Sequence, residues 1–438
     1  MRKDKDFTNM YISYEKTQRR RRGGKGWKVF LVVLLAATLG IGTFLLVSKQ
    51  IDLDKYYNQD DLISTDNELG EEDAEVEVTP DPTPEVTPQP TAEAKVEKEE
   101  DPRTPVRVKG LYVSAPVASN EDKINALIEV AESTEINALV IDVKDDDGRI
   151  TYAMDSEFAE SIGATTNVIN DMEALVKRLK DKDIYTIARI VAFKDPHLAE
   201  SRHDLAIKNR DGSIYRDTNG ESWVNPYLHE VWNYLIEVSE QAAYIGFDEI
   251  QFDYIRFSTG RGMSEVDFGE GSEEKDKEDI ILEFTKYAYD KLKPLGVFVS
   301  ADVYGAIITS SIDAGLVGQN YVEMSKHLDY ICPMIYPSHY GDGNYGIEYP
   351  DLEPYKLIRR ALEDSQKKLD VIPEGEHRAI VRPWLQDFTA SWLQNYKYKS
   401  YGPLEIRDQI GGVYAAGYKE WLFWNASGNY TIEGFNEE

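Results

Sequence analysis

Hydrophobic and polar positions follow a repeating order along the chain from residue 105 onward. Short runs rich in β-branched and aromatic residues, typical of strands, are each followed by a longer amphipathic stretch, typical of a helix. The expected strands are 108–115, 138–143, 185–193, 249–257, 297–303, 330–336, 379–385 and 420–424. The expected helices between them are 121–132, 170–182, 228–245, 277–292, 321–327, 354–369 and 404–416.

This alternation predicts an α/β fold with a parallel sheet. Eight strands with intervening helices within residues 105–438 favour a closed (β/α)8 TIM barrel, since each unit adds one strand to the barrel and one helix outside it. A doubly wound open sheet is the alternative. No GxGxxG or GxxxxGK[ST] motif follows any expected strand, so nothing in the pattern supports a nucleotide-binding fold.

The segment 29–47 contains no charged residue and is long enough to cross the hydrocarbon core of a bilayer at about 1.5 Å per residue. Residues 1–28 hold ten Lys/Arg against three Asp/Glu, which predicts a cytoplasmic tail. A cleaved signal peptide would have a shorter apolar core and a small-residue cleavage site, whereas Ser48-Lys49-Gln50 follows here. We therefore expect a single uncleaved transmembrane helix over 29–47, which leaves the barrel outside the cell.

Residues 48–104 are expected to form a disordered acidic linker rich in Pro and Thr. Between 51 and 104 the chain carries four Lys/Arg against eighteen Asp/Glu. Such a segment buries too little apolar surface to offset the entropy of ordering. The linker would hold the folded domain, 105–438, away from the membrane.

Composition excludes several classes of function. The net charge of −30 argues against a nucleic-acid partner, because phosphate binding needs a basic surface. The single Cys excludes an intramolecular disulfide and a Cys-rich zinc site. Six His with no HxH or HExxH motif give little support to a metal-dependent hydrolase. We expect no metal, no cofactor and no obligate protein partner.

The candidate site residues come from the carboxyl ends of the expected strands, where active sites of such barrels lie. Glycoside hydrolysis usually needs two carboxyl groups on opposite sides of the scissile bond. Asp253 shares one face of its strand with Gln251 and is the candidate nucleophile, and Asp302 on the next strand is the candidate acid/base. The structural alternative for each is an ion pair with Arg189, Arg256 or Arg382, which would make these arginines orient carboxylates. The candidate substrate-binding residues are Asp142, Asp145, Arg189, Tyr304, Tyr336, His339, Arg382, Trp384, Asp387, Trp424 and Asn425.

Five sequence motifs carry a family resemblance. GFDEIQFDYIRF (246–257), ADVYG (301–305), YICPMIYPSHY (330–340), RPWLQDF (382–388) and EWLFWNASGNY (420–430) resemble the glycoside hydrolase domain of bacterial cell-surface proteins known as DUF4015. The resemblance covers about 107–430 and implies a TIM-barrel glycosidase.

Two more distant families resemble parts of these motifs. Asp253 takes the place of the amylase-type nucleophile, but Asp302 stands where those enzymes have Glu. Ile255 stands where chitinase-type enzymes have their proton donor, so the substrate-assisted chitinase mechanism is not expected.

The sequence therefore predicts a membrane-anchored extracellular glycosidase that acts on a cell-wall or extracellular polysaccharide. The alternative is a non-catalytic barrel that only binds polysaccharide. A pair of carboxyl groups at the carboxyl ends of the strands would distinguish the two hypotheses, because only the enzyme needs it.

Overall fold

The computed structural model describes residues 101–435. The predicted cytoplasmic tail, transmembrane helix and most of the linker lie outside this range. Within the described range, no helix is both long and apolar enough to span a bilayer.

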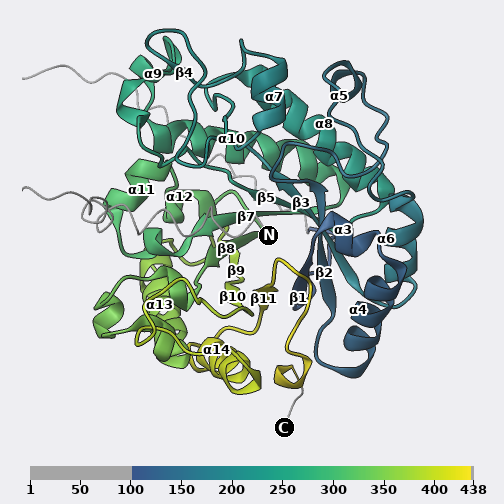
Figure 1. The fold of residues 1–438 in the computed structure, drawn as a ribbon, viewed down its shortest axis with the longest axis vertical. Helices are drawn as coiled ribbons and strands as arrows, with labels where there is room; N and C mark the ends of the chain where they lie inside the picture. Colours follow the sequence, from purple (N-terminus) through teal and green to yellow (C-terminus); the bar gives the residue numbers. More distant parts are fainter. Residues whose placement is uncertain (1–100, 436–438) are drawn as a thin grey trace, which may run out of the picture. The chain divides into compact units, whose positions relative to one another are not determined.

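The described residues form a closed parallel β-barrel surrounded by helices (Figure 1). Neighbouring strands follow the order β10-β11-β1-β2-β3-β5-β7-β8-β9, and β8 also pairs with β10, which closes the sheet on itself. The TIM barrel is confirmed, and the alternative of an open sheet is wrong. The strands are β1 (Lys109–Val113), β2 (Ala138–Lys144), β3 (Tyr185–Val191), β5 (Glu249–Asp253), β7 (Phe298–Tyr304), β8 (Tyr330–Met334), β9 (Ile380–Val381), β10 (Trp384–Gln386) and β11 (Trp421–Trp424).

The expected strand 379–385 is interrupted and appears as β9 and β10. Pro383 lies at the break and has no N–H to donate to a neighbouring strand. Both halves still pair with β8, through Ile380 and Val381 in β9 and Trp384 in β10. Together they fill one position of the barrel, so the barrel has eight positions.

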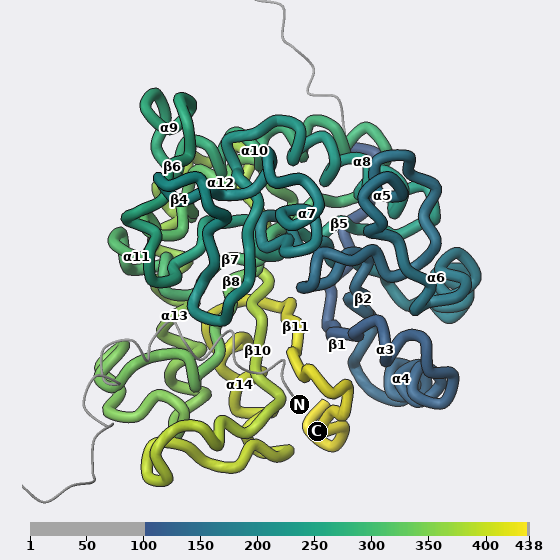
Figure 2. The backbone as a smooth tube through the Cα atoms, turned by 45° about the horizontal axis from the view of Figure 1, so that its top comes forward, coloured from purple at the N-terminus to yellow at the C-terminus, as the bar shows by residue number. Residues whose placement is uncertain are grey.

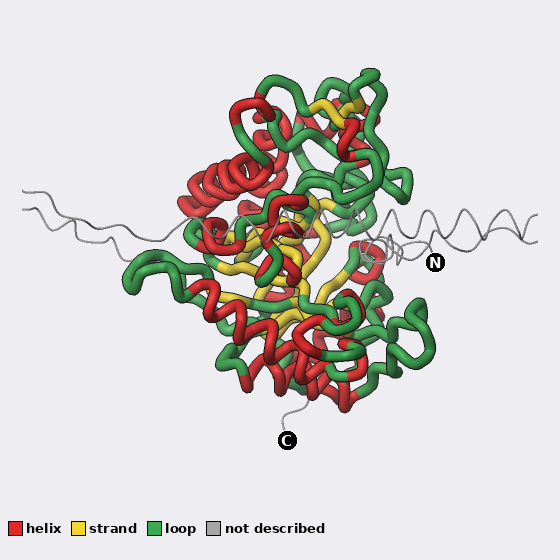
Figure 3. The backbone as a smooth tube through the Cα atoms, turned by 90° about the vertical axis from the view of Figure 1, so that its left-hand side faces the viewer, coloured by secondary structure: helices red, strands yellow, loops and turns green. Residues whose placement is uncertain are grey.

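Helices lie outside the strands, as Figure 3 shows, and seven of them correspond to the expected helices. Several of them begin after a side chain that accepts an N–H group of the first turn, as Asn120, Asp171 and Asp276 do. Each agrees with its expected position to within a few residues. They are α4 (Glu121–Ser133), α6 (Met172–Lys180), α8 (His229–Ile245), α10 (Lys277–Leu292), α12 (Tyr321–Ser325), α13 (Pro354–Leu369) and α14 (Pro403–Ala415).

Several short elements were not expected. β4 (Lys208–Asn209), in the long connection after β3, pairs antiparallel with β6 (Val266–Asp267), in the connection after β5. These two connections lie side by side (Figure 2), and both leave the carboxyl ends of barrel strands. The additional short helices are α3 (Ala115–Ala118), α5 (Glu157–Ser161), α7 (Pro196–Ser201), α9 (Gly271–Glu274) and α11 (Ser311–Val317).

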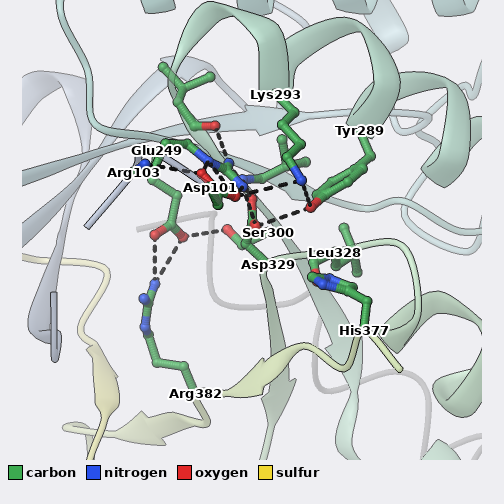
Figure 4. Close-up of polar contacts among 12 residues, drawn as sticks. Asp101, Arg103, Glu249, Tyr289, Lys293, Ser300, Leu328, Asp329, His377 and Arg382 are labelled. Carbon is green, nitrogen blue, oxygen red and sulfur yellow. Dashed lines mark hydrogen bonds and ion pairs between the residues drawn. The ribbon is translucent and has the colours of Figure 1, made fainter. Parts of the chain in front are cut away.

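A buried ion-pair network fills the barrel at the end where the strands begin (Figure 4). Arg382 Nη1 donates to both carboxylate oxygens of Glu249 at 2.9 Å, and its Nε donates to Glu420 at 2.9 Å. Ser300 Oγ donates to Glu249 at 2.5 Å, and the guanidinium lies 3.7 Å from the Tyr330 ring centre. Because the charges are buried together with hydrogen-bond partners, the network can be accommodated in the interior.

The chain reaches the barrel at the same end. Arg103 donates through Nη1 to the Val297 carbonyl at 2.7 Å and to Asp329 at 2.8 Å. Asp101 accepts from the same guanidinium at 2.7 Å (Figure 4). We call this contact among Asp101, Arg103 and Asp329 the latch. Val297 and Asp329 directly precede β7 and β8, so the latch fixes these residues, which belong to the expected linker, at the strand-start end.

Candidate active site

The site is organised around Arg189 on β3. In the parallel register Arg189 lies between Asp142 of β2 and Gln251 of β5, and Val191 lies opposite Asp253. Arg189 Nε and Nη2 donate to Asp253 Oδ2 at 3.0 and 2.6 Å, while Nη1 donates to Asp142 at 2.7 Å. Arg189 therefore orients two carboxylates at the carboxyl ends of neighbouring strands.

The backbone after β5 completes the environment of Asp253. The N–H of Tyr254 donates to Asp253 Oδ1 at 2.6 Å. Tyr254 has a φ of 51°, in the left-handed region that costs a non-glycine residue about 1–2 kcal/mol. This strain lies directly beside the candidate nucleophile, as strained residues often do at functional sites. Three N–H groups therefore stabilise the negative charge of Asp253 and fix its orientation.

Asp302 on β7 has a different environment. Its Oδ1 accepts a hydrogen bond from Trp384 Nε1 at 2.6 Å, and the residue is 2% exposed. Burial, and then the nearby charge of Asp253, hold the pKa of Asp302 well above its ordinary value. The site thus pairs a carboxyl group whose neutral form is favoured by burial with a carboxyl group that accepts three N–H groups, which suits the division of roles between an acid and a nucleophile.

Asp142 is a positioning residue for Arg189. Tyr112 Oη donates to its other oxygen at 2.6 Å. Burial raises the pKa of Asp142 to about 6, against the opposing influence of Arg189. Tyr112 was not expected at the site. Tyr112 lies opposite Val140, and Val140 is two residues before Asp142 on the same face of β2. This shared face is the signal that could have revealed Tyr112.

Aromatic rings flank the arginine and the carboxylates. Tyr112 stacks on Trp424 with ring centres 3.8 Å apart, and Trp384 meets Trp424 edge-on at 5.8 Å. The Arg189 guanidinium lies 5.3 Å from the Trp424 ring centre. Tyr112 and Trp384 are buried, whereas Trp424 is partly exposed and can stack against the C–H face of a sugar.

A second group of rings surrounds Arg256, which follows β5. Its guanidinium lies 4.9, 4.8 and 4.6 Å from the ring centres of Trp223, Tyr254 and Tyr304. Trp223 comes from the unexpected connection after β3. Tyr304 is therefore placed beside the strained turn that holds Asp253.

Tyr336 and His339 follow β8. Burial raises the pKa of Tyr336, and the charges of Asp302 and Asp253 add to the effect, so this ring lies near both carboxyl groups. Its centre is 5.2 Å from that of His339. Burial lowers the pKa of His339 to about 4, so this imidazole is neutral at neutral pH.

The other candidates make contacts that stabilise loops or the barrel interior. Asp145 accepts the backbone N–H groups of Asp147 and Arg149 within its own turn. Asp387 accepts from the N–H and hydroxyl of Thr431, each at 2.8 Å, and Asn425 donates to the Asp387 carbonyl at 2.6 Å. Arg382 belongs to the network at the strand-start end and is not brought together with Asp253 and Asp302.

One further acidic residue joins the site. Asp146, which the sequence did not single out, accepts from Arg189 Nη2 at 3.2 Å. Across the described residues, His, Cys, Asp and Glu side chains form no group of three or more that could hold a metal ion.

Comparison with known families identifies the domain. Residues 110–430 match the family model DUF4015, described as "Putative glycosyl hydrolase domain". The chain belongs to the DUF4015 family. The family expected from the motifs is thereby confirmed, and membership makes the chain a glycosidase. No protein of curated function matches the chain.

Two solved structures resemble this DUF4015 domain. A hypothetical protein from Ruminiclostridium thermocellum ATCC 27405 is 38% identical, covering 44% of this chain and 97% of that one, with a TM-score of 0.41. The PgaB (BpsB) glycoside hydrolase domain from Bordetella bronchiseptica is 11% identical, covering 76% of this chain and 100% of that one, with a TM-score of 0.54. The second likeness shows the shared fold.

Proposed function

We propose that this glycosidase cleaves a cell-wall or extracellular polysaccharide, with Asp253 as nucleophile and Asp302 as general acid. The observation that carries the proposal is the pair of carboxyl groups on the adjacent strands β5 and β7. Three N–H groups stabilise the charge of Asp253, whereas burial raises the pKa of Asp302 and so favours its neutral form. These are the two states that the first step of glycoside cleavage requires.

The reaction follows from these states. Asp302 gives its proton to the glycosidic oxygen while Asp253 attacks the anomeric carbon, so the leaving sugar departs and a glycosyl ester forms on Asp253. Asp302, now a carboxylate, takes a proton from water, whose oxygen attacks the anomeric carbon and releases Asp253. Two displacements retain the anomeric configuration.

Arg189 and the aromatic rings have supporting roles. Arg189 holds Asp253 in place, and Asp142 with Tyr112 fixes the arginine. Trp424, which is partly exposed, would stack against the sugar next to the scissile bond, and Trp384 is buried behind it. Because Trp384 donates to Asp302 and meets Trp424 edge-on, this buried side chain supports both the acid and the sugar-stacking ring.

We also propose that segment 29–47 anchors the protein in the cell membrane, with the linker and barrel outside. The apolar segment and its basic flank support this location. In this arrangement the latch at Asp101 and Arg103 leaves the catalytic end of the barrel opposite the point where the chain reaches the domain.

The test is turnover by the full-length protein on purified cell walls and extracellular polysaccharides, measured as newly formed reducing ends. Asp253→Asn and Asp302→Asn should abolish most of the release, and Asp211→Asn, at an exposed turn, serves as the control. Polysaccharide binding without release by the unmutated protein would support the non-catalytic barrel instead. NMR of the first product distinguishes retention from inversion.

A further inference from the structure

Aromatic rings continue beyond the carboxyl pair onto the loop that follows β10. The Tyr336 ring centre lies 5.2 Å from that of His339, which lies 6.3 Å from that of Trp392. A second path runs from Tyr336 to Phe388 at 5.9 Å and on to Trp392 at 5.8 Å. We call Tyr336, His339, Phe388 and Trp392 the aromatic row.

The inner end of this row lies at the catalytic carboxyl groups. The N–H of Ile335 donates to the Trp384 carbonyl at 3.0 Å, so Tyr336 follows directly after a residue bonded to Trp384. The indole of Trp384 in turn donates to Asp302. The row therefore starts beside the general acid.

The outer end of the row reaches solvent. Tyr336 is 3% exposed, whereas Trp392 is 38% exposed, with Phe388 and His339 half-buried between them. The rings of Phe388 and Trp392 are inclined by only 28°, and His339 meets Trp392 at 88°. Trp392 is thus supported by two rings and still presents part of its own surface to solvent.

The loop that carries Trp392 is held in place by its own contacts. The N–H of Leu393 donates to the Ala390 carbonyl at 3.0 Å, forming a turn around Trp392. The N–H of Tyr401 donates to Thr389 Oγ1 at 3.1 Å, and Lys397 pairs with Asp342 at 2.6 Å. A ligand that stacks on Trp392 would therefore pay little of the entropic cost of ordering this loop.

We propose that Trp392 forms a further sugar-binding subsite and that the substrate is a glycan chain reaching from the scissile bond along the aromatic row. Each ring-to-ring step is comparable with the length of one sugar unit, and an indole face matches the C–H face of a pyranose. The proposal rests on the proposed function for the identity of the ligand as a glycan. It implies that at least two sugar units are bound on one side of the scissile bond.

The experiment measures binding by full-length protein that carries Asp253→Asn, which leaves the oligosaccharides intact. The probes are cello-, chito- and malto-oligosaccharides from dimer to hexamer, titrated by calorimetry. Affinity for the recognised series should rise with length, and Trp392→Ala should weaken hexamer binding about tenfold, the effect of losing one well-packed aromatic contact. Dimer binding should change less than twofold.

Two matched variants complete the design. Trp392→Phe keeps an aromatic face and should retain most of the affinity. Tyr244→Ala removes another exposed aromatic ring, 68% exposed near the end of α8, and should change nothing. Equal hexamer binding by the parent protein and Trp392→Ala, affinity that does not rise with length, or binding of none of the three series would overturn the subsite. Length-dependent binding by a protein that never cleaves would overturn the hydrolytic proposal and leave the subsite standing.

Discussion

At the scale of single residues, two aspartates of the same chemical type are given different states by their surroundings. Asp253 accepts N–H groups from Arg189 and Tyr254, while Asp302 accepts one from Trp384 and is otherwise buried. The first arrangement stabilises negative charge, and the second favours the neutral acid. The two predictions at this scale test these opposite states.

Asp253→Asn should lower kcat by at least about a thousandfold, because the amide keeps the shape but cannot attack the anomeric carbon. Circular dichroism should show an unchanged fold, since Arg189 keeps its bond to Asp142. Azide should restore activity to Asp253→Gly by filling the vacated space, and should give a product of inverted configuration. Near-normal turnover by the Asn variant would show that Asp253 is structural.

The pH profile of kcat should depend on Asp302. Its pKa is raised above the ordinary carboxyl value, so the acid is protonated below that raised pKa and activity is lost as pH rises through it. Asp302→Asn should remove this alkaline limb on aryl glycosides with good leaving groups, which need little proton donation. If the variant kept the limb, another group would be the acid.

At the scale of elements, long periodic segments could be predicted and short irregular ones could not. α13 and α10 begin and end where the pattern of apolar residues placed them. The two-residue strands β4 and β6 have no period to detect, because their pairing depends on contact between connections far apart in sequence. For the same reason Trp223 was missed, whereas Asp253 and Asp302 could be found from their positions at strand ends. Tyr112 lies before the end of its expected strand, 108–115, and was missed because of that position.

The role of Arg382 could not be predicted from the alternation of side chains along a strand. Its distance from the carboxyl end of its strand could not be judged because Pro383 divides that strand. The structure places the guanidinium between Glu249 and Glu420, a pairing that joins three strands and leaves no local signal in the sequence.

The loop that carries Trp392 offers a stability prediction. Asp351, 1% exposed, accepts hydrogen bonds from Gln386 Nε2 at 3.1 Å and from the N–H of Lys399 at 3.4 Å. Burial raises the pKa of Asp351 to about 6, so its contribution to the free energy of unfolding is full at acidic pH and is lost as pH rises from about 4 through about 6. The loss should be on the order of 2–3 kcal/mol.

Asp351→Asn should remove that decline, because the amide cannot ionise. Urea unfolding at pH 4 and pH 7 gives the difference in unfolding free energy between parent and variant. Taking this difference cancels the similar contribution of Asp142, which both proteins share. A difference between parent and variant that does not change with pH would mean that folding leaves the pKa of Asp351 unchanged.

At the scale of the whole molecule, the barrel has two ends with separate tasks. The strand-start end holds the Glu249–Arg382–Glu420 network and the latch, and the carboxyl end holds the catalytic groups. Because the two ends are separate, we expect substitutions in the latch to leave the catalytic activity unchanged.

Arg103→Ala should lower the free energy of unfolding by about 2–4 kcal/mol, because it leaves the largely buried Asp329 without its cation. Turnover per folded molecule should be unchanged. Arg261→Ala, at an exposed position, provides the control in the same denaturation assay. Equal stability of the two variants would contradict a stabilising latch.

Membrane attachment is tested on the full-length protein in cells. It should remain with membranes after high-salt and carbonate washing, and external protease should reach the barrel, because a transmembrane helix over 29–47 is not removed by either wash. A released mature form beginning near residue 50 would show that the segment is a cleaved signal.

The latch also determines where mechanical load enters the domain. A pull transmitted through the residues before Asp101 reaches the barrel first at the contact of Arg103 with Asp329 and the Val297 carbonyl. Tension is therefore carried into the starts of β7 and β8, at the end remote from Asp302 and Trp384. If this contact broke, the few residues between Arg103 and β1 could extend before any barrel strand is strained. The latch would therefore break before force reaches the catalytic end.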